Sequence, residues 1–335
     1  MITQHDEQTS RQCPTLSVVL SFRNEAAVLP ELLRQLRAVL RPLKETGALR
    51  DYELIFINDL STDGSEALLR HELSRAPDVR LINMSRNFGI SPCVLAGMAY
   101  ASGDAVVYMD TDLQDPPPVI AELLQVWQQD PRVDVVHTVR SRRLGETAFK
   151  RALTRLGYQI LQSVSTIHLP IEAGDFKLLS RKVVKHLLDF PEKSPYLRGL
   201  VCWVGFEQRF VTYERAARFA GDTHFPVLSV AVISNFFNSA LLAFSGFPLR
   251  LALYAGIGAC LPAACVSAWM CLRGLQGIPL EGWSWVLLAV LWLGAAQLIG
   301  LGLLGLYVYA ILQEARQRPQ YIVREALGFP PSSAR

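Results

Sequence analysis

The chain has 335 residues, half of them hydrophobic, and its 33 lysines and arginines nearly balance its 30 aspartates and glutamates. This length corresponds to about two domains and excludes a mini-protein. The near balance of charge argues against a nucleic-acid-binding protein, and the apolar content excludes intrinsic disorder. The charged residues are unevenly placed, because Pro226–Gln313 carries three of the 63 whereas Met1–Phe225 carries 54. We therefore expect one part of the chain to face water and another to face lipid.

Short apolar runs alternate with amphipathic stretches in the first part of the chain. The runs, which are typical of strands buried on both faces, are Leu16–Phe22, Glu53–Asn58, Val79–Met84, Ala105–Asp110 and Val133–Val139. The stretches between them, which predict helices, are Ala26–Leu40, Ser65–Leu73, Ser91–Ala101 and Val119–Gln128. This alternation predicts an α/β fold with a doubly wound, mostly parallel sheet. Ligands in such sheets bind at the carboxyl ends of the strands.

Two aspartates follow the fourth apolar run, within the string Tyr108–Pro118. Asp110 and Asp112 are two residues apart, a spacing that in extended geometry places both carboxylates on one side. Such hard oxygen donors suit Mg²⁺ or Mn²⁺ bridging a substrate diphosphate. The alternative is that both residues only end a strand and cap the next helix. Gln114, Asp115 and the proline run make the pattern more specific than an isolated pair of aspartates.

Polar and charged residues also follow the first three apolar runs. Acidic groups there can accept hydrogen bonds from a base or a ribose, whereas arginine suits phosphate. The candidates are Ser21, Arg23 and Glu25 after the first run, Asn58 and Asp59 after the second, and Arg86 and Asn87 after the third. Each segment taken singly could be a turn with a helix cap. Charged residues after four successive strands favour a binding site.

The stretch Arg140–Arg155 is strongly basic, with Glu146 as its one acid. One interpretation is a solvated basic helix near anionic lipid, where each charge contributes about 1 kcal/mol. The other is an acceptor site for a lipid phosphate, and the two are compatible. The candidate residues for that acceptor site are Arg142, Arg143, Lys150 and Arg151.

Three apolar stretches follow in the lipid-facing part. Leu251–Leu272 has no charge and is long enough to cross about 30 Å of hydrocarbon. Gly282–Gln313 is also free of charge and carries tryptophans and tyrosines near its ends, a pattern typical of membrane interfaces. We therefore predict two transmembrane helices, at about 251–272 and 285–311, within 250–313. Val227–Phe247 has a stripe of Asn and Ser opposite an apolar side. This pattern predicts an amphipathic helix, at residues 226–249, that lies on the membrane surface. The alternative is a third transmembrane span.

Charge also predicts the orientation in the membrane. Four arginines lie in the tail 314–335, whereas the loop between the predicted spans has only Arg273 and Glu281. The positive-inside rule then places the tail and the first domain in the cytoplasm. The N-terminus has no apolar signal-peptide core, and the six cysteines form no CxxC pair, which fits a reducing compartment. We expect a multi-pass protein of the inner membrane that faces the cytoplasm.

These motifs resemble those of family 2 glycosyltransferases of the GT-A fold, and specifically the polyprenyl-phosphate glycosyltransferases related to dolichol-phosphate mannose synthase and its bacterial counterparts. The resemblance is carried, in order, by Ser21–Glu25, Ile57–Ser65, Ser85–Gly89, Asp110–Pro117, Gly174–Lys182, Leu197–Leu200, Tyr213–Phe225 and Phe244–Arg250. It implies a GT-A catalytic domain over 1–225, with Asp112 and Gln114 as ligands of Mg²⁺ or Mn²⁺ and Asp110 nearby.

The resemblance also implies further site residues. The nucleotide contacts would come from Ser21, Arg23, Glu25 and Asp59, the diphosphate contacts from Arg140 and Arg218, and Asp175 would orient the acceptor or the donor sugar. The chain departs from the family pattern at three places. Asn58, Asp59 and Leu60 replace two aspartates and a glycine, Arg23 replaces an aromatic residue, and His224 replaces a lysine near the diphosphate. Because imidazole titrates near pH ~6.5, we expect donor affinity to depend on pH there.

The expected activity is the transfer of one sugar from a nucleotide diphosphate sugar to a polyprenyl phosphate, which would be undecaprenyl phosphate in a bacterium. The lipid phosphate would attack the anomeric carbon in line and invert it. A processive polysaccharide synthase is one alternative, although the chain has no QxxRW motif and only two clear spans. A non-catalytic membrane scaffold is another, favoured by Asn58 and His224 and opposed by the complete Asp110–Gln114 run. The oligomeric state, the identity of the transferred sugar and the nucleobase of the donor are left open; a homo-oligomer is one possibility.

Overall fold

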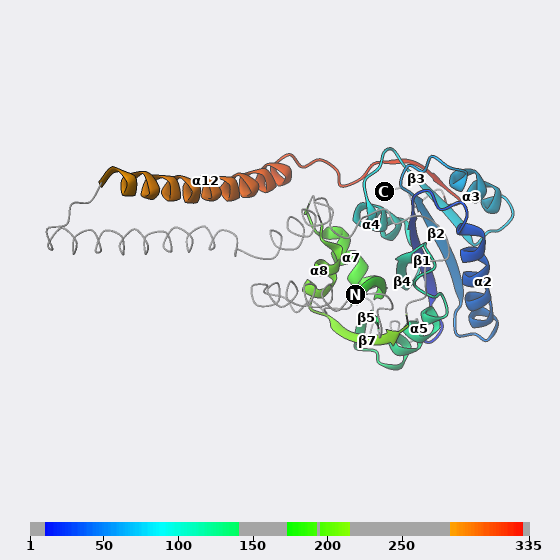
Figure 1. The fold of residues 1–335 in the computed structure, drawn as a ribbon. Coiled ribbons are helices and arrows are strands. Elements are labelled where there is room, and N and C mark those ends of the chain that lie inside the picture. The colour runs from blue at the N-terminus through cyan, green and yellow to red at the C-terminus, as the bar shows by residue number, and fades with distance from the viewer. Residues whose placement is uncertain (1–10, 141–172, 193–194, 215–281, 331–335) are drawn as a thin grey trace. The chain divides into compact units, whose positions relative to one another are not determined.

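The computed structural model describes residues 11–140, 173–192, 195–214 and 282–330. These residues form one mixed sheet with helices on both faces, and one long helix that belongs to a second unit (Figure 1). The strands are β1 (Thr15–Phe22), β2 (Asp51–Asn58), β3 (Val79–Met84), β4 (Ala105–Asp110), β5 (Val133–Arg140), β6 (Ala173–Ser180), β7 (Glu207–Tyr213) and β8 (Val323–Leu327). The helices are α2 (Leu29–Glu45), α3 (Ser65–Leu73), α4 (Ile90–Tyr100), α5 (Val119–Gln129), α7 (Arg181–Asp189), α8 (Leu197–Trp203) and α12 (Gly282–Ala315).

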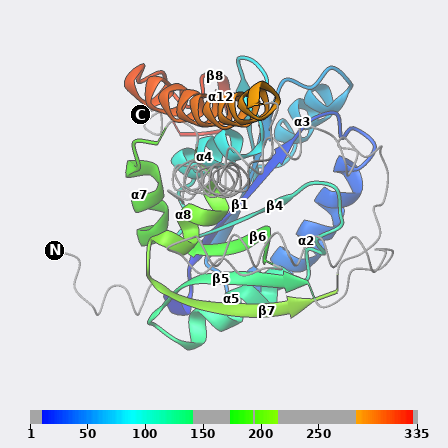
Figure 2. The same ribbon diagram turned by 60° about the vertical axis from the view of Figure 1, so that its left-hand side comes forward.

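The sheet has the strand order β7-β5-β6-β4-β1-β2-β3-β8 (Figure 2). The four central strands β4, β1, β2 and β3 are parallel, whereas β6 pairs antiparallel with β4 and β5, and β8 pairs antiparallel with β3. The five strands predicted from apolar runs are all present, and the mostly parallel α/β sheet is confirmed.

The helices cover both faces of the sheet because its central strands are apolar on both sides. On one face, α2 and α5 pack against alternate residues of the central strands, including Leu16, Val18 and Leu20. On the other face, α4 lies directly on β1 and β2 (Figure 1). Gly97 permits this close approach, since a Cβ there would lie 2.5 Å from Val19 Cγ1 and 2.7 Å from Ile57 Cδ1.

The structure differs from the predicted elements at two points. Helix α2 begins at Leu29 rather than Ala26, because Pro30 favours the first helical turn and the Ala26 N–H donates to Asp63 Oδ2 over 3.0 Å in the preceding loop. The strands β6, β7 and β8 and the helices α7 and α8 were not predicted. Strand β8 lies within 314–335, which was predicted to be a cytoplasmic tail, and the described residues 319–330 group with the sheet rather than with α12.

The second predicted span falls on α12, in the second unit. Among the residues described, no helix is found that is long and apolar enough to cross a membrane, so the two spans stay predictions. The first predicted span and the predicted amphipathic helix at 226–249 lie outside the described residues.

Candidate active site

The carboxyl ends of the central strands lie level with one another. In the sheet register Ser21 is opposite Asp110, Phe22 is opposite Asn58, and Asn58 is opposite Asn83. The polar residues that follow β1, β2 and β4 therefore emerge at one edge of the sheet, as the sequence predicted. This edge is where parallel α/β sheets bind ligands.

Three loops at this edge contain a non-glycine residue in the left-handed backbone region. Asn24 after β1, Leu60 after β2 and Leu113 after β4 have φ values of 59°, 58° and 58°. This conformation costs a leucine about 1 kcal/mol or more, and such residues cluster at functional sites. The family pattern has a glycine where this chain has Leu60, and the observed φ explains why glycine suits that position.

Four carboxylates gather where the carboxyl end of β4 meets the start of β6. Burial is the main cause that raises the pKa of Asp110 to about 7, and the charges of Asp175, Asp115 and Asp112 raise it further, while Arg198 opposes them. Because β6 runs antiparallel to β4, its early residue Asp175 comes to the same edge as Asp110. The result is a concentration of negative charge that a nearby cation would stabilise.

Arg198, on α8, is a cation in contact with this cluster. Its Nε donates to Asp175 Oδ1 over 2.6 Å, and its Nη2 donates to Asp175 Oδ2, so the ion pair is bidentate. The segment Leu197–Leu200 is one of the motifs that resemble the family, but Arg198 was not among the predicted site residues. Its position inside a motif of the family was a signal in the sequence that could have identified it. Its partner, Asp175, can be identified only from the fold.

Two aspartates, Asp112 and Asp115, stabilise the loop after β4. Asp112 is 8% exposed, and its Oδ1 accepts a hydrogen bond of 3.1 Å from the Gln114 backbone N–H. Asp115 is fully buried and accepts a hydrogen bond from the Tyr213 hydroxyl on β7. Asp115 thus anchors the loop to the sheet. Asp112 and Gln114, in the same loop, are the predicted metal ligands.

The donor set suits Mg²⁺ or Mn²⁺ in the presence of a diphosphate. Among the residues that the structure describes, no group of three or more His, Cys, Asp or Glu side chains could hold a metal ion. Mg²⁺ at nucleotide sites usually needs only one or two carboxylates, because phosphate oxygens and water supply its other ligands. Asp112 and Gln114, beside the carboxylate charge that surrounds Asp110, fit that requirement.

The residues predicted to bind the donor substrate, which lie at or after the ends of β1, β2 and β3, occupy two kinds of environment. Arg23 and Arg86 are exposed, and Arg86 lies 4.4 Å from the centre of the Phe88 ring. Ser21 and Glu25 are half-buried. All four residues lie at or just after the carboxyl end of β1 or β3.

Asp59 and Asn58, in contrast, are buried and engaged within the protein. The Asp59 carboxylate accepts hydrogen bonds from the backbone N–H groups of Phe88 (2.7 Å) and Gly89 (3.0 Å), which ties the loop after β3 to the end of β2. Asn58 is 1% exposed, and its amide bonds to Asn83, Glu66 and the Ser61 backbone. In the structure both residues hold neighbouring loops in place.

The remaining candidates lie beyond what the structure describes. Arg140 ends β5 and its backbone is paired with Tyr213, but its side chain is not described. The other candidates outside the described residues are Arg142, Arg143, Lys150, Arg151, Arg218 and His224.

Comparison with known proteins shows the family of the chain. Residues 17–188, more than half of the chain, match the family described as "Glycosyl transferase family 2". The chain is 38% identical over 316 residues to an uncharacterized glycosyltransferase, YkcC, of Bacillus subtilis, covering 93% of this chain and 94% of that protein. It is 35% identical over 314 residues to the SfII prophage-derived bactoprenol glucosyl transferase of Shigella flexneri, covering 93% and 98%.

Among solved structures, a mannosyltransferase from Pyrobaculum calidifontis in complex with GDP-Man and Mn²⁺ is 18% identical, with a TM-score of 0.43 and coverage of 86% of this chain and 87% of that one. The strand order and the flanking helices define an α/β protein with a mostly parallel sheet. The match over residues 17–188 and the full-length relatives are decisive: the chain belongs to glycosyl transferase family 2.

Proposed function

We propose that this enzyme transfers one sugar from a nucleotide diphosphate sugar to a polyprenyl phosphate at the cytoplasmic face of the membrane. The observation that carries the proposal is the similarity to proteins named bactoprenol glucosyl transferase, which extends over 92–93% of this chain and so includes its apolar part. The acidic edge, with its Asp175–Arg198 pair, supplies a place where donor and acceptor could meet.

In the proposed reaction, an oxygen of the lipid phosphate attacks the anomeric carbon of the donor sugar. A bond forms between that oxygen and the anomeric carbon as the bond from this carbon to the diphosphate oxygen breaks, and the nucleoside diphosphate leaves with the electron pair. Attack from the opposite side inverts the anomeric configuration. The protein needs no general base, because a phosphate monoester is already anionic at pH 7. Asp175, oriented by Arg198, would hold a hydroxyl of the sugar.

A divalent cation is part of this proposal. Asp112 and Gln114 would hold Mg²⁺ or Mn²⁺ with Asp110 beside them, as the chemistry of these donors permits. When bound, the ion supplies positive charge that stabilises the departing diphosphate. The arginines of the loops, Arg23 and Arg86, are exposed at the same edge and would bind phosphate oxygens.

The membrane location rests on the apolar part of the chain. Leu251–Leu272 and Gly282–Gln313 carry no charge. Large apolar side chains are exposed along α12, including Val286, Trp292 and Ile311. Exposed apolar surface of this extent favours contact with lipid or with another chain. We propose that lipid covers it.

The pairing of β8 supports an even number of membrane crossings. Strand β7 ends at Tyr213 and β8 begins at Val323, and both belong to the same sheet. Whatever path the chain takes between them, it starts and finishes on one side of the membrane. This favours two spans, with Val227–Phe247 on the membrane surface, over three.

We expect a reporter fused after Arg335 to lie on the cytoplasmic side of the membrane. An alkaline phosphatase fusion should be inactive and a green fluorescent protein fusion should be fluorescent, because β8 must reach the same compartment as β3. The matched control is the same pair of reporters fused after Gly277, in the loop between the predicted spans, where the activities should be reversed. An active phosphatase after Arg335 would contradict the two-span arrangement.

The activity is tested by the mass of the lipid product. Purified full-length enzyme is incubated with polyprenyl phosphate, Mg²⁺ and a panel of UDP- and GDP-sugars. We expect one sugar residue per lipid, from one nucleotide sugar. A ladder of products would indicate a processive synthase instead. No transfer and no metal-dependent hydrolysis of any donor would indicate a non-catalytic scaffold.

A further inference from the structure

The chain returns from α12 to the catalytic sheet and adds its last strand there. Strand β8 pairs antiparallel with β3, with Asn83 opposite Glu325. The Ser85 N–H donates to the Ile322 carbonyl over 2.9 Å, and the rings of Phe329 and Tyr100 lie 5.0 Å apart. The segment is thus attached to the sheet by its backbone and by side chains beyond the strand.

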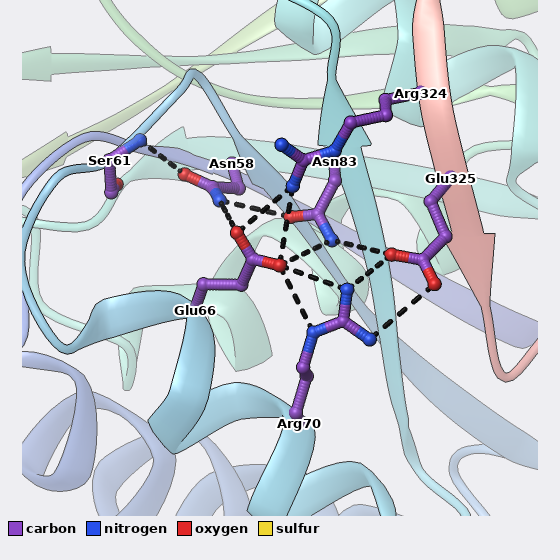
Figure 3. Close-up of polar contacts among 7 residues, drawn as sticks. All are labelled: Asn58, Ser61, Glu66, Arg70, Asn83, Arg324 and Glu325. Carbon is purple, nitrogen blue, oxygen red and sulfur yellow. Dashed lines mark hydrogen bonds and ion pairs between the residues drawn. The ribbon is translucent and has the colours of Figure 1, made fainter.

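A polar network joins β8 to the neighbouring elements (Figure 3). Glu325 forms an ion pair with Arg70 of α3 and accepts a hydrogen bond of 3.2 Å from Asn83 Nδ2. Glu66, also on α3, accepts from Arg70 over 2.9 Å, from Asn83 over 3.2 Å, and from Arg324 over 3.1 Å. Each carboxylate oxygen of Glu66 and Glu325 therefore faces at least one donor.

The network ends at the turn that follows β2. Asn58 Nδ2 donates to Asn83 Oδ1 over 2.9 Å and to Glu66 Oε2 over 3.2 Å, and Asn58 Oδ1 accepts from the Ser61 N–H over 2.8 Å. Ser61 Oγ in turn accepts from the Asn24 N–H over 3.0 Å. A continuous series of hydrogen bonds thus leads from the C-terminal strand to the loops after β2 and β1.

The same contacts explain why asparagine rather than aspartate occupies position 58. A carboxylate there would lose both donors, and it would lie 3.2 Å from the Glu66 carboxylate. Two carboxylates in direct contact at a largely buried position repel each other, which is unfavourable even though Glu66 is paired with Arg70 and Arg324. Asn58 therefore supplies the N–H donors that Glu66 and Asn83 accept, and its amide is buried.

We infer that Glu325 is a positioning residue for the nucleotide site. Directly through Asn83, and through Arg70 to Glu66, it holds Asn58, and with it the turn that carries Asp59 and Ser61, in the conformation that binds the donor. The inference rests on the proposed function, since it assigns the loops after β1 and β2 to the donor. It assigns the strand that follows the apolar region a role in donor binding, whereas the sequence analysis treated that segment as a tail.

The test compares Glu325→Ala with the matched control Glu31→Ala, which also removes a glutamate from an ion pair, with Arg34 on α2, but is not part of the network. Full-length enzyme is titrated with UDP and with GDP in the presence of Mg²⁺, and KM and kcat are measured for the donor. We expect Glu325→Ala to raise the dissociation constant and KM about fivefold, the size of one partly exposed charge-assisted contact. The control should leave both unchanged.

A purely structural role predicts a different pattern. Loss of stability alone would lower the melting temperature and the active fraction, and hence kcat, without changing the dissociation constant or KM. An unchanged dissociation constant in Glu325→Ala would overturn the inference. If that variant does not fold, Glu325→Gln replaces it. Its amide oxygen still accepts from Asn83 but it loses the charge, so the expected rise is smaller, about twofold.

Different results would contradict the proposed glycosyl transfer and the positioning role of Glu325. Wild-type enzyme that transfers no sugar to polyprenyl phosphate would contradict the proposed function. Wild-type enzyme that transfers sugar normally, together with Glu325 variants that bind UDP and GDP as tightly as wild type, would contradict only the positioning role of β8.

Discussion

Replacing Asp112 with asparagine is expected to lower sugar transfer at least ~100-fold, because the variant keeps the size of the side chain but loses the charge that holds a divalent ion beside the diphosphate. Folding should be unchanged, since asparagine retains the Oδ1 atom that accepts from the Gln114 N–H. EDTA should reduce the wild-type rate strongly and the variant rate little. Excess Mn²⁺ should restore part of the loss, whereas more lipid phosphate should not.

The control for this prediction is Asp130→Asn, which changes an aspartate at the end of α5 that is paired with Arg132. It should transfer sugar at the wild-type rate. If Asp112 only caps the following helix, the variant would lose about 1 kcal/mol of stability and keep nearly normal turnover. Turnover within a few-fold of wild type in Asp112→Asn would refute its role as a metal ligand.

Replacing Arg198 with glutamine should reduce transfer at least ~10-fold, which corresponds to the loss of one charge-assisted interaction of about 1.4 kcal/mol. The variant removes the bidentate partner of Asp175. It also removes the positive charge that opposes the rise in the pKa of Asp110. Because the ion pair is partly exposed, its free-energy contribution is expected at the lower end of the range for charge-assisted hydrogen bonds.

Two further variants test whether Asp175 and Arg198 act as a unit. Arg198→Lys keeps the charge but cannot form the bidentate contact, so its loss should be smaller than that of Arg198→Gln. The double variant Asp175→Asn, Arg198→Gln should be no slower than the slower single variant, since residues in one ion pair are coupled. Losses that multiply in the double variant would show that the two side chains act independently.

The sequence predicted the elements whose signal is local. The strands β1 to β5 are continuous apolar runs, and the residues after β1, β2 and β4 could be assigned to one sheet edge because parallel strands end together. The strands that were missed have weak local signals. Asp175 and Lys177 interrupt the apolar pattern of β6, and most positions of β7 are not buried.

The contacts that organise the candidate site could not be predicted, because their partners are distant in the chain. Glu325 is 242 residues from Asn83, and Arg198 is 23 residues from Asp175 across a strand and a helix. Strand β8 is five residues long and contains two charges, so nothing in its sequence distinguishes it from a solvated tail. Only the fold shows that Asn58, selected as a donor contact, bonds to Asn83 and Glu66.

The most direct test of the proposed function is the NMR spectrum of the lipid product formed by the wild-type enzyme. We expect the anomeric proton of the transferred sugar to couple to the phosphorus of the polyprenyl phosphate, and the anomeric configuration to be opposite to that of the nucleotide sugar. This result would show that the lipid phosphate is the nucleophile in a single inverting displacement. An anomeric proton without coupling to phosphorus, or a retained configuration, would contradict the mechanism proposed for this enzyme.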